Sequence, residues 1–273
     1  MHNFVSFNQQ ISPASEPTFS ALSPAALYGK GIFTTVAIYH QKPFLWENHW
    51  RRLKQNAEQV RIDLSDFSER VVYQSLSEII RKNAVGSGRA RLTFFDEKPA
   101  PIWSYPSKKK TGLLITTADF RVISEISLTL SPYPINSLSP LCGVKSCNYL
   151  ENLLAFEAAK SGGFDEAVRL NERGEISSAC LANIFWLTGE EIYTPSLETG
   201  CLAGTTRELV LRHFPVHEVK ATLAALENAD GIFLTSAGIG IAQVNLFGKR
   251  TLKDSDKFFE INSFFRKFRA QNR

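Results

Sequence analysis

The stretch that most constrains the fold begins at Gly143 and reads GVKSCNYLENLLAFEAAKSGGFDEAVRLNERGEISSACLANIFW. A lysine stands just ahead of a long, mostly apolar helix pattern. Strand patterns joined by an Asn-Glu-Arg-Gly turn follow that helix. In the first ~120 residues, strands flank two helices, which is typical of an α+β or mixed α/β layer.

The chain has 273 residues, near the length at which single cores stop growing, so two domains or one large domain are expected. We predict a smaller N-terminal α/β domain over 1–120. A linker rich in Pro, Ser and Asn is expected over 121–140, and a larger C-terminal α/β domain carrying the lysine over 141–273.

Periodicity predicts the elements within each half. In the first half, GIFTTVAIYHQKPFLW reads as a hairpin and ENHWRRLKQNAEQV as a helix. A second helix lies in SDFSERVVYQSLSEIIRK, with Ser65 as N-cap and Gly86 and Gly88 as stop signals, and strands follow in RARLTFF and GLLITTA. In the second half, helices are predicted over about 148–161, from Thr205, in TLAALENAD and at the C-terminal end. Its strands are EAVRL, EISSA, NIFWL, EIYTP and GIFLTSA.

Composition excludes several classes of protein. No run of eighteen apolar residues occurs and the N-terminus lacks the form of a signal peptide, so we expect a cytoplasmic protein without a membrane span. The four cysteines show no zinc-site spacing, so no metal is expected. The net charge of +4 gathers at the KKK of 108–110 and in the last ten residues, which is too narrow for a nucleic-acid surface.

Lys145 is the first candidate for chemistry. Lysines are seldom buried unless they are used, and a desolvated lysine has a depressed pKa and can form a Schiff base. An ordinary surface lysine is the alternative.

Two glycine-rich segments are candidate anion sites. In GCLAGTTREL the amides of Thr205 and Thr206 would open a helix at the positive end of its dipole, which suits a phosphate, although N-capping by a threonine is the alternative. In LTSAGIG, Ser236 and the amides from Ala237 onward could form a second nest, or an ordinary glycine turn. Arg52 is a phosphate candidate if it faces inward. Arg91 alternates with apolar residues in RARLTFF, so an inward charge would need an anionic partner such as a substrate carboxylate.

The order of these segments is more specific than any one of them. HWRRL, GVKSCNYL, NERGEISSACLANIFW, GCLAGTTRELVL and LTSAGIGIAQV together resemble the class IV aminotransferases, the fold-type IV enzymes that use pyridoxal 5'-phosphate (PLP). The resemblance runs from about Tyr28 to Val244. It implies two α/β domains with the cofactor between them, in a homodimer that binds a small-molecule substrate.

The resemblance also implies a role for each candidate residue. Lys145 would hold PLP as a Schiff base and shuttle protons. Arg52, the backbone of Thr205 and Thr206, and the Ser236–Ala237 turn would hold the phosphate. Leu202 would pack under the pyridine ring, and Tyr149 would lie near the phenolic oxygen of the cofactor.

Two positions bear on the reaction. Many members carry a glutamate that pairs with the pyridine nitrogen, and this chain has Ser178 there. A neutral hydroxyl would leave the nitrogen largely unprotonated, which disfavours transamination more than elimination. Glu175 could compensate, but strand alternation turns it away from Ser178 unless the register shifts. Thr34-Thr35 resembles the family's lyases, in which the second threonine assists catalysis; two threonines are also ordinary strand formers.

Three functions therefore remain open. The preferred one is a lyase that converts 4-amino-4-deoxychorismate to 4-aminobenzoate and pyruvate, with Lys145 and Thr35 as catalytic residues and Arg91 on a substrate carboxylate. The second is an aminotransferase of branched-chain or D-amino acids. The third is a family member that has lost catalysis and serves as a binding protein.

Overall fold

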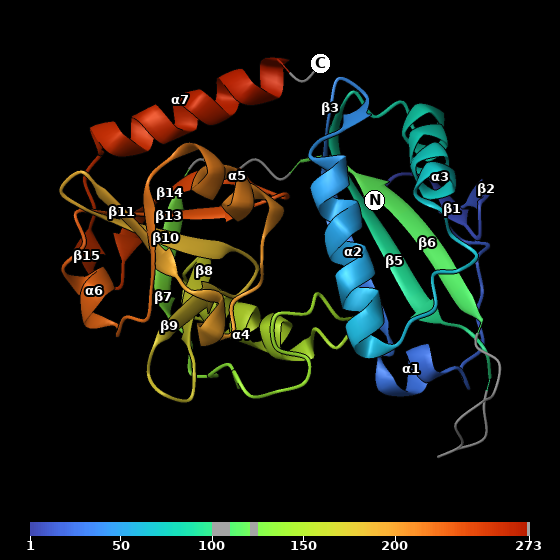
Figure 1. The fold of residues 1–273 in the computed structure, drawn as a ribbon, viewed down its shortest axis with the longest axis horizontal. Coiled ribbons are helices and arrows are strands. Elements are labelled where there is room, and N and C mark those ends of the chain that lie inside the picture. The colour runs from blue at the N-terminus through green and yellow to red at the C-terminus, as the bar shows by residue number, and fades with distance from the viewer. Residues whose placement is uncertain (100–109, 121–124, 272–273) are drawn as a thin grey trace. The chain divides into compact units, whose positions relative to one another are not determined.

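The computed structural model describes residues 1–99, 110–120 and 125–271. The chain divides into two compact units. Unit 1 comprises residues 1–120 and 144–148, and unit 2 comprises residues 121–143 and 149–272. Each unit contains one β-sheet with its own helices, which makes the protein a mixed α/β fold, as predicted (Figure 1).

Unit 1 is built on a six-stranded antiparallel sheet in the order β2-β1-β6-β5-β3-β4. Its strands are β1 (Phe4–Phe7), β2 (Gln10–Pro13), β3 (Gly31–Tyr39), β4 (Lys42–Pro43), β5 (Ser87–Asp96) and β6 (Thr111–Ala118). Its helices are α1 (Pro24–Tyr28), α2 (Trp46–Val60) and α3 (Glu69–Lys82). The predicted β3–β4 hairpin, both long helices and strands β5 and β6 are confirmed.

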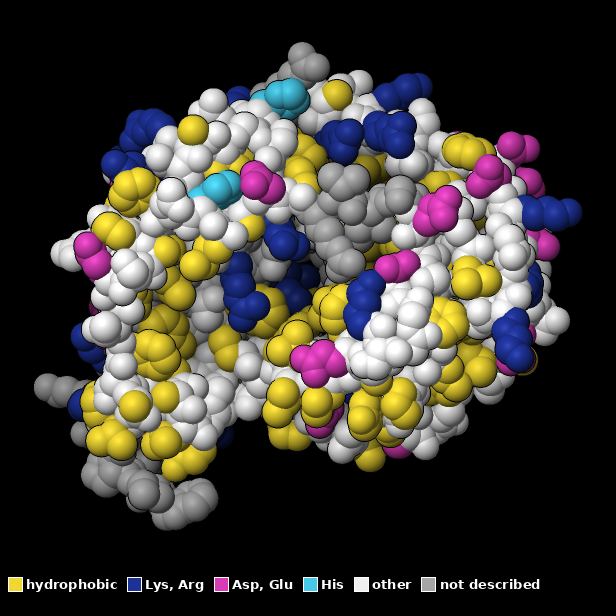
Figure 2. Space-filling view, turned by 180° about the vertical axis from the view of Figure 1, so that it is seen from behind, with side chains coloured by type: hydrophobic (Ala, Val, Ile, Leu, Met, Phe, Trp, Pro, Cys, Tyr) yellow, Lys and Arg dark blue, Asp and Glu magenta, His cyan; other side chains and the backbone are white. Residues whose placement is uncertain are grey.

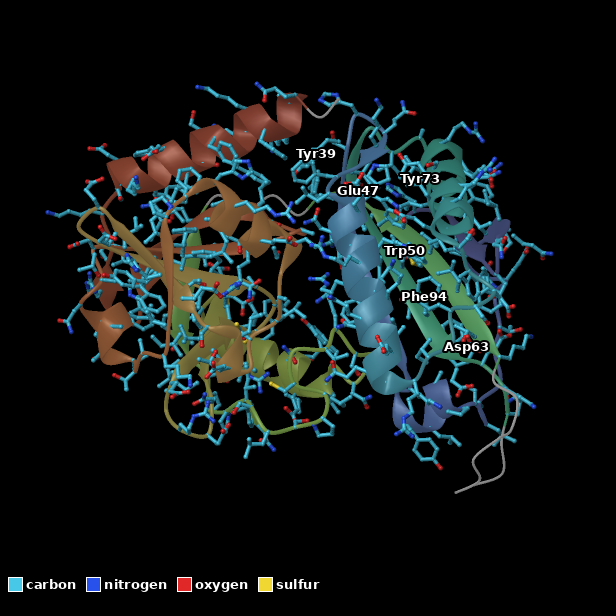
Figure 3. The ribbon with its side chains drawn as sticks, viewed as in Figure 1. Tyr39, Glu47, Trp50, Asp63, Tyr73 and Phe94 are labelled. Carbon is cyan, nitrogen blue, oxygen red and sulfur yellow. The ribbon has the colours of Figure 1, made fainter. Side chains whose placement is uncertain are left out.

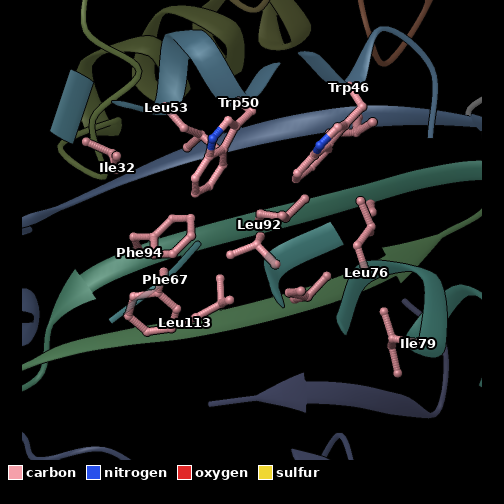
Figure 4. Close-up of a cluster of buried hydrophobic side chains, with 14 of the residues drawn as sticks. Ile32, Trp46, Trp50, Leu53, Phe67, Leu76, Ile79, Leu92, Phe94 and Leu113 are labelled. Carbon is pink, nitrogen blue, oxygen red and sulfur yellow. The ribbon is translucent and has the colours of Figure 1, made fainter. Parts of the chain in front are cut away.

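The core of unit 1 lies between α2, α3 and one face of this sheet (Figure 4). Trp50 of α2 and Phe94 of β5 point toward one another, with ring centroids 6.5 Å apart (Figure 3). Residues of β3 and β5 alternate between the two faces, so Ile32 is fully buried in this core. Phe33 and Thr35 consequently face the other side of the sheet.

The start of α3 differs from the prediction. Ser68 is the N-cap, and its side chain accepts a hydrogen bond from the amide of Val71, whereas the amide of Ser65 donates to the Asp63 carboxylate two residues earlier in the chain. The helix ends at Lys82 before either predicted glycine, with Asn83 as C-cap, and Gly88 lies inside β5.

This difference gives a paired test of stability. Because a lost N-cap typically costs about 1 kcal/mol, S68A should lower the free energy of unfolding by roughly that amount in urea titration. Ser65 is equally exposed but caps nothing, so S65A should change it by less than about 0.5 kcal/mol. Equal losses in the two variants would contradict the assigned cap.

Unit 2 contains a nine-stranded mixed sheet in the order β12-β11-β10-β13-β14-β7-β8-β9, with β15 on β14. Its strands are β7 (Ile126–Leu130), β8 (Glu166–Leu170), β9 (Ile176–Ala179), β10 (Asn183–Thr188), β11 (Glu191–Pro195), β12 (Val216–Val219), β13 (Gly231–Ser236), β14 (Gly240–Phe247) and β15 (Arg250–Thr251). Its helices are α4 (Leu150–Ser161), α5 (Thr205–His213), α6 (Ala224–Glu227) and α7 (Asp256–Gln271), with a 3-10 turn at Leu197–Thr199.

The core of unit 2 includes both faces of this sheet. One apolar cluster joins β7–β11, β13 and β14 to the short helix α6. On the other side, Phe185 and Phe233 stack with centroids 4.8 Å apart, and Phe233 contacts Phe258 of α7. The predicted stripe on α7 is confirmed as core, because Phe258, Ile261 and Phe265 are buried.

The division of the chain differs from the predicted domains in two places. The segment 121–140, predicted as a linker, belongs to unit 2 and contributes β7 to its sheet. Lys145, predicted to lie in the C-terminal domain, lies in unit 1 because residues 145–147 pair with the edge of β3. Pairing with an open strand edge, rather than position in the sequence, decides where this lysine belongs.

Candidate active site

Lys145 is fixed by its backbone on both sides. Its carbonyl accepts the amide of Phe33 at 2.9 Å, and its own amide donates to the side chain of Asn56 on α2 at 2.9 Å. Ser146 bridges to Ile32, and the amide of Cys147 donates to the carbonyl of Gly31. The lysine is therefore held to a rigid strand and a rigid helix.

The environment of the Lys145 amine favours its neutral form. Desolvation, followed by the charges of Arg52 and Arg91, lowers the pKa of Lys145 from about 10.5 to about 7. The Nζ atom lies 4.4 Å from the centroid of the Phe33 ring. A pKa of about 7 leaves a large fraction of this amine unprotonated and nucleophilic at neutral pH, as Schiff-base formation requires.

Arg52 lies in a buried hydrogen-bonded chain that the sequence analysis did not identify. Its Nη2 donates to Thr34 Oγ1 at 2.9 Å, and that hydroxyl lies 2.7 Å from Nδ1 of His49. Burial, then Arg52 and Lys145, lower the pKa of His49 well below its usual value, so the imidazole is neutral. The signal was present in the sequence, since His49 and Arg52 are three residues apart on one face of a helix.

Arg91 does not have the buried position that its strand pattern left possible. The residue is exposed, because alternation in β5 buries Ala90 and Leu92 and turns Arg91 to the opposite face. Its guanidinium lies 3.6 Å from the centroid of the Phe33 ring, and its Nε donates to Thr93. Arg91 is also the strand partner of Thr35, so their side chains share one face.

The two predicted anion segments of unit 2 are joined through Asn183. This residue pairs with Thr235 across β10 and β13, and its side-chain amide donates to the carbonyl of Leu202 at 2.8 Å. The ends of α5 and β13 are thereby fixed to the same strand. Ser236, Ala237 and Leu202 are half-buried, and Thr205 and Thr206 are buried.

The start of α5 has the form expected of an anion site. Gly204 is the N-cap and has no side chain to accept from the first-turn amides, so capping by a threonine is wrong. A Cβ on Gly204 would lie 2.0 Å from Oδ1 of Asn183, so a larger residue there would displace the Asn183 side chain. This geometry fits a phosphate, which accepts from such amides at the positive end of a helix.

Ser178 and Tyr149 occupy separate elements of unit 2. Ser178 is buried in β9, opposite Arg169 of β8, and Tyr149 is the half-buried N-cap residue of α4. Arg169 pairs with Ser178 but Leu170 pairs with Ile176, so Ser177 is an extra residue in β9 and strand alternation does not carry through this hairpin. Glu175 does not compensate for the missing glutamate, because Asn171 at 2.7 Å and Arg173 at 2.8 Å hold its carboxylate.

The described residues can also be searched for a membrane span, a metal site and a basic surface, the three features that composition disfavoured. None of the helices of residues 1–99, 110–120 and 125–271 is long and apolar enough to cross a bilayer. Within those ranges, no group of three or more His, Cys, Asp or Glu side chains could hold a metal. On the face shown in Figure 2, Lys and Arg side chains stand in small groups among Asp and Glu. Most of the basic run at 108–110 lies outside the described residues.

Comparison with known proteins decides the family. The model of the amino-transferase class IV family matches residues 31–247. The chain belongs to the class IV aminotransferases. It is 25% identical over 252 residues to the aminodeoxychorismate lyase of Bacillus subtilis, covering 86% of this chain and 83% of that one. It is 27% identical over 278 residues to a putative branched-chain-amino-acid aminotransferase of Methanocaldococcus jannaschii, covering 94% and 95%.

Solved structures of this family share the fold. The branched-chain aminotransferase of Thermoproteus uzoniensis with norvaline superimposes with a TM-score of 0.91 at 22% identity, covering 98% of this chain and 94% of that one. Class IV members with different reactions thus resemble this chain to a similar degree. Family membership is settled by these matches, and the reaction must be argued from the residues.

Proposed function

We propose that this protein is a PLP-dependent lyase that converts 4-amino-4-deoxychorismate to 4-aminobenzoate and pyruvate. One observation carries the proposal: Thr35 is the strand partner of Arg91, on the sheet face of Phe33, whose ring contacts both the Lys145 amine and the Arg91 guanidinium. A base, a hydroxyl and a cation therefore gather around one aromatic ring. These are the groups needed to remove a proton, protonate a leaving oxygen and bind a carboxylate.

Each unit, taken by itself, has residues whose chemistry suits PLP. In unit 1, Lys145 offers a largely neutral amine for the aldehyde, and Arg52 offers a buried cation for the phosphate. In unit 2, we assign the phosphate to the amides of Thr205 and Thr206 and to the Ser236–Ala237 turn. Leu202 would contact the ring, Tyr149 its phenolic oxygen and Ser178 its nitrogen. Bound PLP supplies the electron sink that acidifies the amine-bearing carbon of the substrate.

The protein's own groups perform the remaining steps in this proposal. Arg91 binds a substrate carboxylate and orients the ring of the substrate, while its stacking on Phe33 fixes the guanidinium. Lys145 removes the proton from the amine-bearing carbon, because its lowered pKa makes it a base at neutral pH. Thr35 or Lys145 then donates a proton to the departing enolpyruvyl group, which leaves as pyruvate.

The direct test gives purified, PLP-loaded protein 4-amino-4-deoxychorismate and follows pyruvate and 4-aminobenzoate together. The proposal expects both products in equal amounts. In parallel, the same protein receives branched-chain or D-amino acids with a keto-acid acceptor. Amino transfer without any pyruvate would refute the lyase and support the aminotransferase, which the similarity to the Methanocaldococcus jannaschii relative favours.

The adjacent threonines provide a matched pair of variants. T35V removes a half-buried hydroxyl on the Arg91 face and should lower kcat for pyruvate release about 10²-fold or more, with unfolding free energy little changed. T34V removes the fully buried hydroxyl that Arg52 and His49 share, so it should cost about 1–3 kcal/mol of stability. Kinetics and urea titration of both variants separate these roles. Full activity in T35V would remove Thr35 from the mechanism.

A further inference from the structure

Arg169 is the most deeply buried charge near the position of the missing glutamate. It lies on β8 with its side chain only 2% exposed, and its direct strand partner on β9 is Ser178. Directly opposed residues of an antiparallel pair place their side chains on the same face, with Cβ atoms about 5 Å apart. The Cβ atom of Arg169 therefore lies next to that of Ser178, the residue that we assign to the pyridine nitrogen.

The charge of Arg169 is poorly neutralised. Its Nε donates to the carbonyl of Tyr133 at 3.1 Å and its Nη2 to that of Pro134 at 2.9 Å, so its main partners are uncharged. Glu151 of α4 approaches at 3.6 Å, but the side chain of that residue is 79% exposed and screened by water.

The other carboxylates of this hairpin are engaged elsewhere. The Glu166 carboxylate accepts the amides of Cys180 and Leu181 at 2.9 and 3.0 Å. In the turn, Glu172 is bound by Ser137 and Arg173, and Glu175 is bound by Asn171 and Arg173. The face shared by Arg169 and Ser178 is therefore biased toward positive charge.

We propose that Arg169 disfavours a positive charge on the pyridine nitrogen of bound PLP and is a specificity-determining residue of this enzyme. The inference rests on the proposed function in one respect, the assignment of Ser178 to that nitrogen. A buried cation repels a nearby cation, and the hydroxyl of Ser178 does not compensate as a carboxylate would. A neutral ring is the weaker electron sink, so this charge favours expulsion of a leaving group over amino transfer.

Two cofactor analogues test the proposal by binding alone. N-methylpyridoxal 5'-phosphate carries a permanent charge on the ring nitrogen, and 1-deazapyridoxal 5'-phosphate has no ring nitrogen. The Kd of each is measured on cofactor-free wild-type protein and on R169M and R169K. The quantity compared is the Kd of the charged analogue divided by the Kd of the neutral one. We expect this ratio to fall about tenfold or more in R169M. It should stay near the wild-type value in R169K, because lysine keeps the charge.

A second pair of variants leaves the buried arginine in place. E151Q removes the carboxylate that approaches Arg169 and should raise the ratio about two- to threefold, a typical effect of an exposed ion pair. E157Q removes an exposed carboxylate from the same helix and should leave it unchanged.

Three results would overturn the proposal. One is a ratio in folded R169M within twofold of the wild type. Another is an equal fall in R169K, which would mark a packing role. The third is an equal ratio of the two analogues' Kd values in E151Q and E157Q. This result decides the matter if R169M does not fold. Failure of the lyase itself is distinguishable, because it would appear as absent pyruvate whatever the analogue ratios.

Discussion

Replacing Lys145 by methionine is expected to lower pyruvate release by a factor of about 10⁴ or more, because the variant loses the covalent anchor and the base together. The change should not unfold the protein, since the hydrogen bonds that fix residues 145–147 to β3 and to Asn56 are made by the backbone. Removal of a desolvated amine should even be neutral or stabilising.

The readouts for K145M are steady-state kinetics and the visible absorption of protein mixed with PLP. The matched control is K54M, which removes an exposed lysine from α2. K54M should keep both activity and absorption. A K145M protein that remains coloured after gel filtration and releases pyruvate within tenfold of the wild-type rate would show that another residue performs the chemistry.

The stability of the cofactor-free protein should depend on pH through the same lysine. The pKa of Lys145 is about 7 in the folded protein and near 10.5 in the unfolded chain. Between these values the unfolded chain binds more protons, so the free energy of unfolding rises with pH through this window. At low pH the folded state must accommodate a desolvated ammonium group, which is the destabilising term.

The size of this effect is large for one side chain. The fall in the pKa of Lys145 from 10.5 to about 7 corresponds to an upper limit of about 5 kcal/mol, and the partial solvent access of the side chain reduces the effect to about 2–3 kcal/mol. Urea titrations from pH 6 to 9 should show most of the rise in wild type and a clearly flatter profile in K145M. The neutral His49 does not titrate in this range, because its pKa lies well below the usual value. Parallel profiles in the two proteins would contradict the lowered lysine pKa.

Helices and strands with strong periodicity could be predicted from the sequence. Helix α5 begins at Thr205 and β13 spans Gly231–Ser236, as the glycine, threonine and β-branched patterns indicate. Strands β1, β2, β7, β12, β14 and β15 were not predicted. All of them except β14 are only two to five residues long, too short for alternation to be informative. The eight residues of β14 contain a register shift between Val244 and Leu246, which interrupts their alternation. The N-cap of α3 was misplaced because Ser65 and Ser68 both precede the apolar run, and only their hydrogen bonds distinguish them.

For the candidate site, the sequence indicated the local features but not the contacts between distant residues. Lys145 and the helix start at Thr205 are local features, so the sequence indicated both the lowered lysine pKa and the residue at which α5 begins. Long-range contacts were not visible. The alternation in RARLTFF could not tell which face of β5 packs against α2, so it left open a buried Arg91, whereas the residue is exposed. The pairing of Asn183 with Thr235, and the bulge beside Ser178, depend on strand register, which a single sequence does not specify.

The central claim is that the amine of Lys145 carries the cofactor covalently, and one measurement tests it most directly. Protein incubated with PLP is reduced with borohydride, digested and analysed by mass spectrometry. The account predicts a phosphopyridoxyl adduct on the peptide that contains Lys145, in near-stoichiometric yield, and none on that peptide in K145M. An adduct confined to other lysines, or no adduct at all in protein that is folded and saturated with PLP, would contradict it.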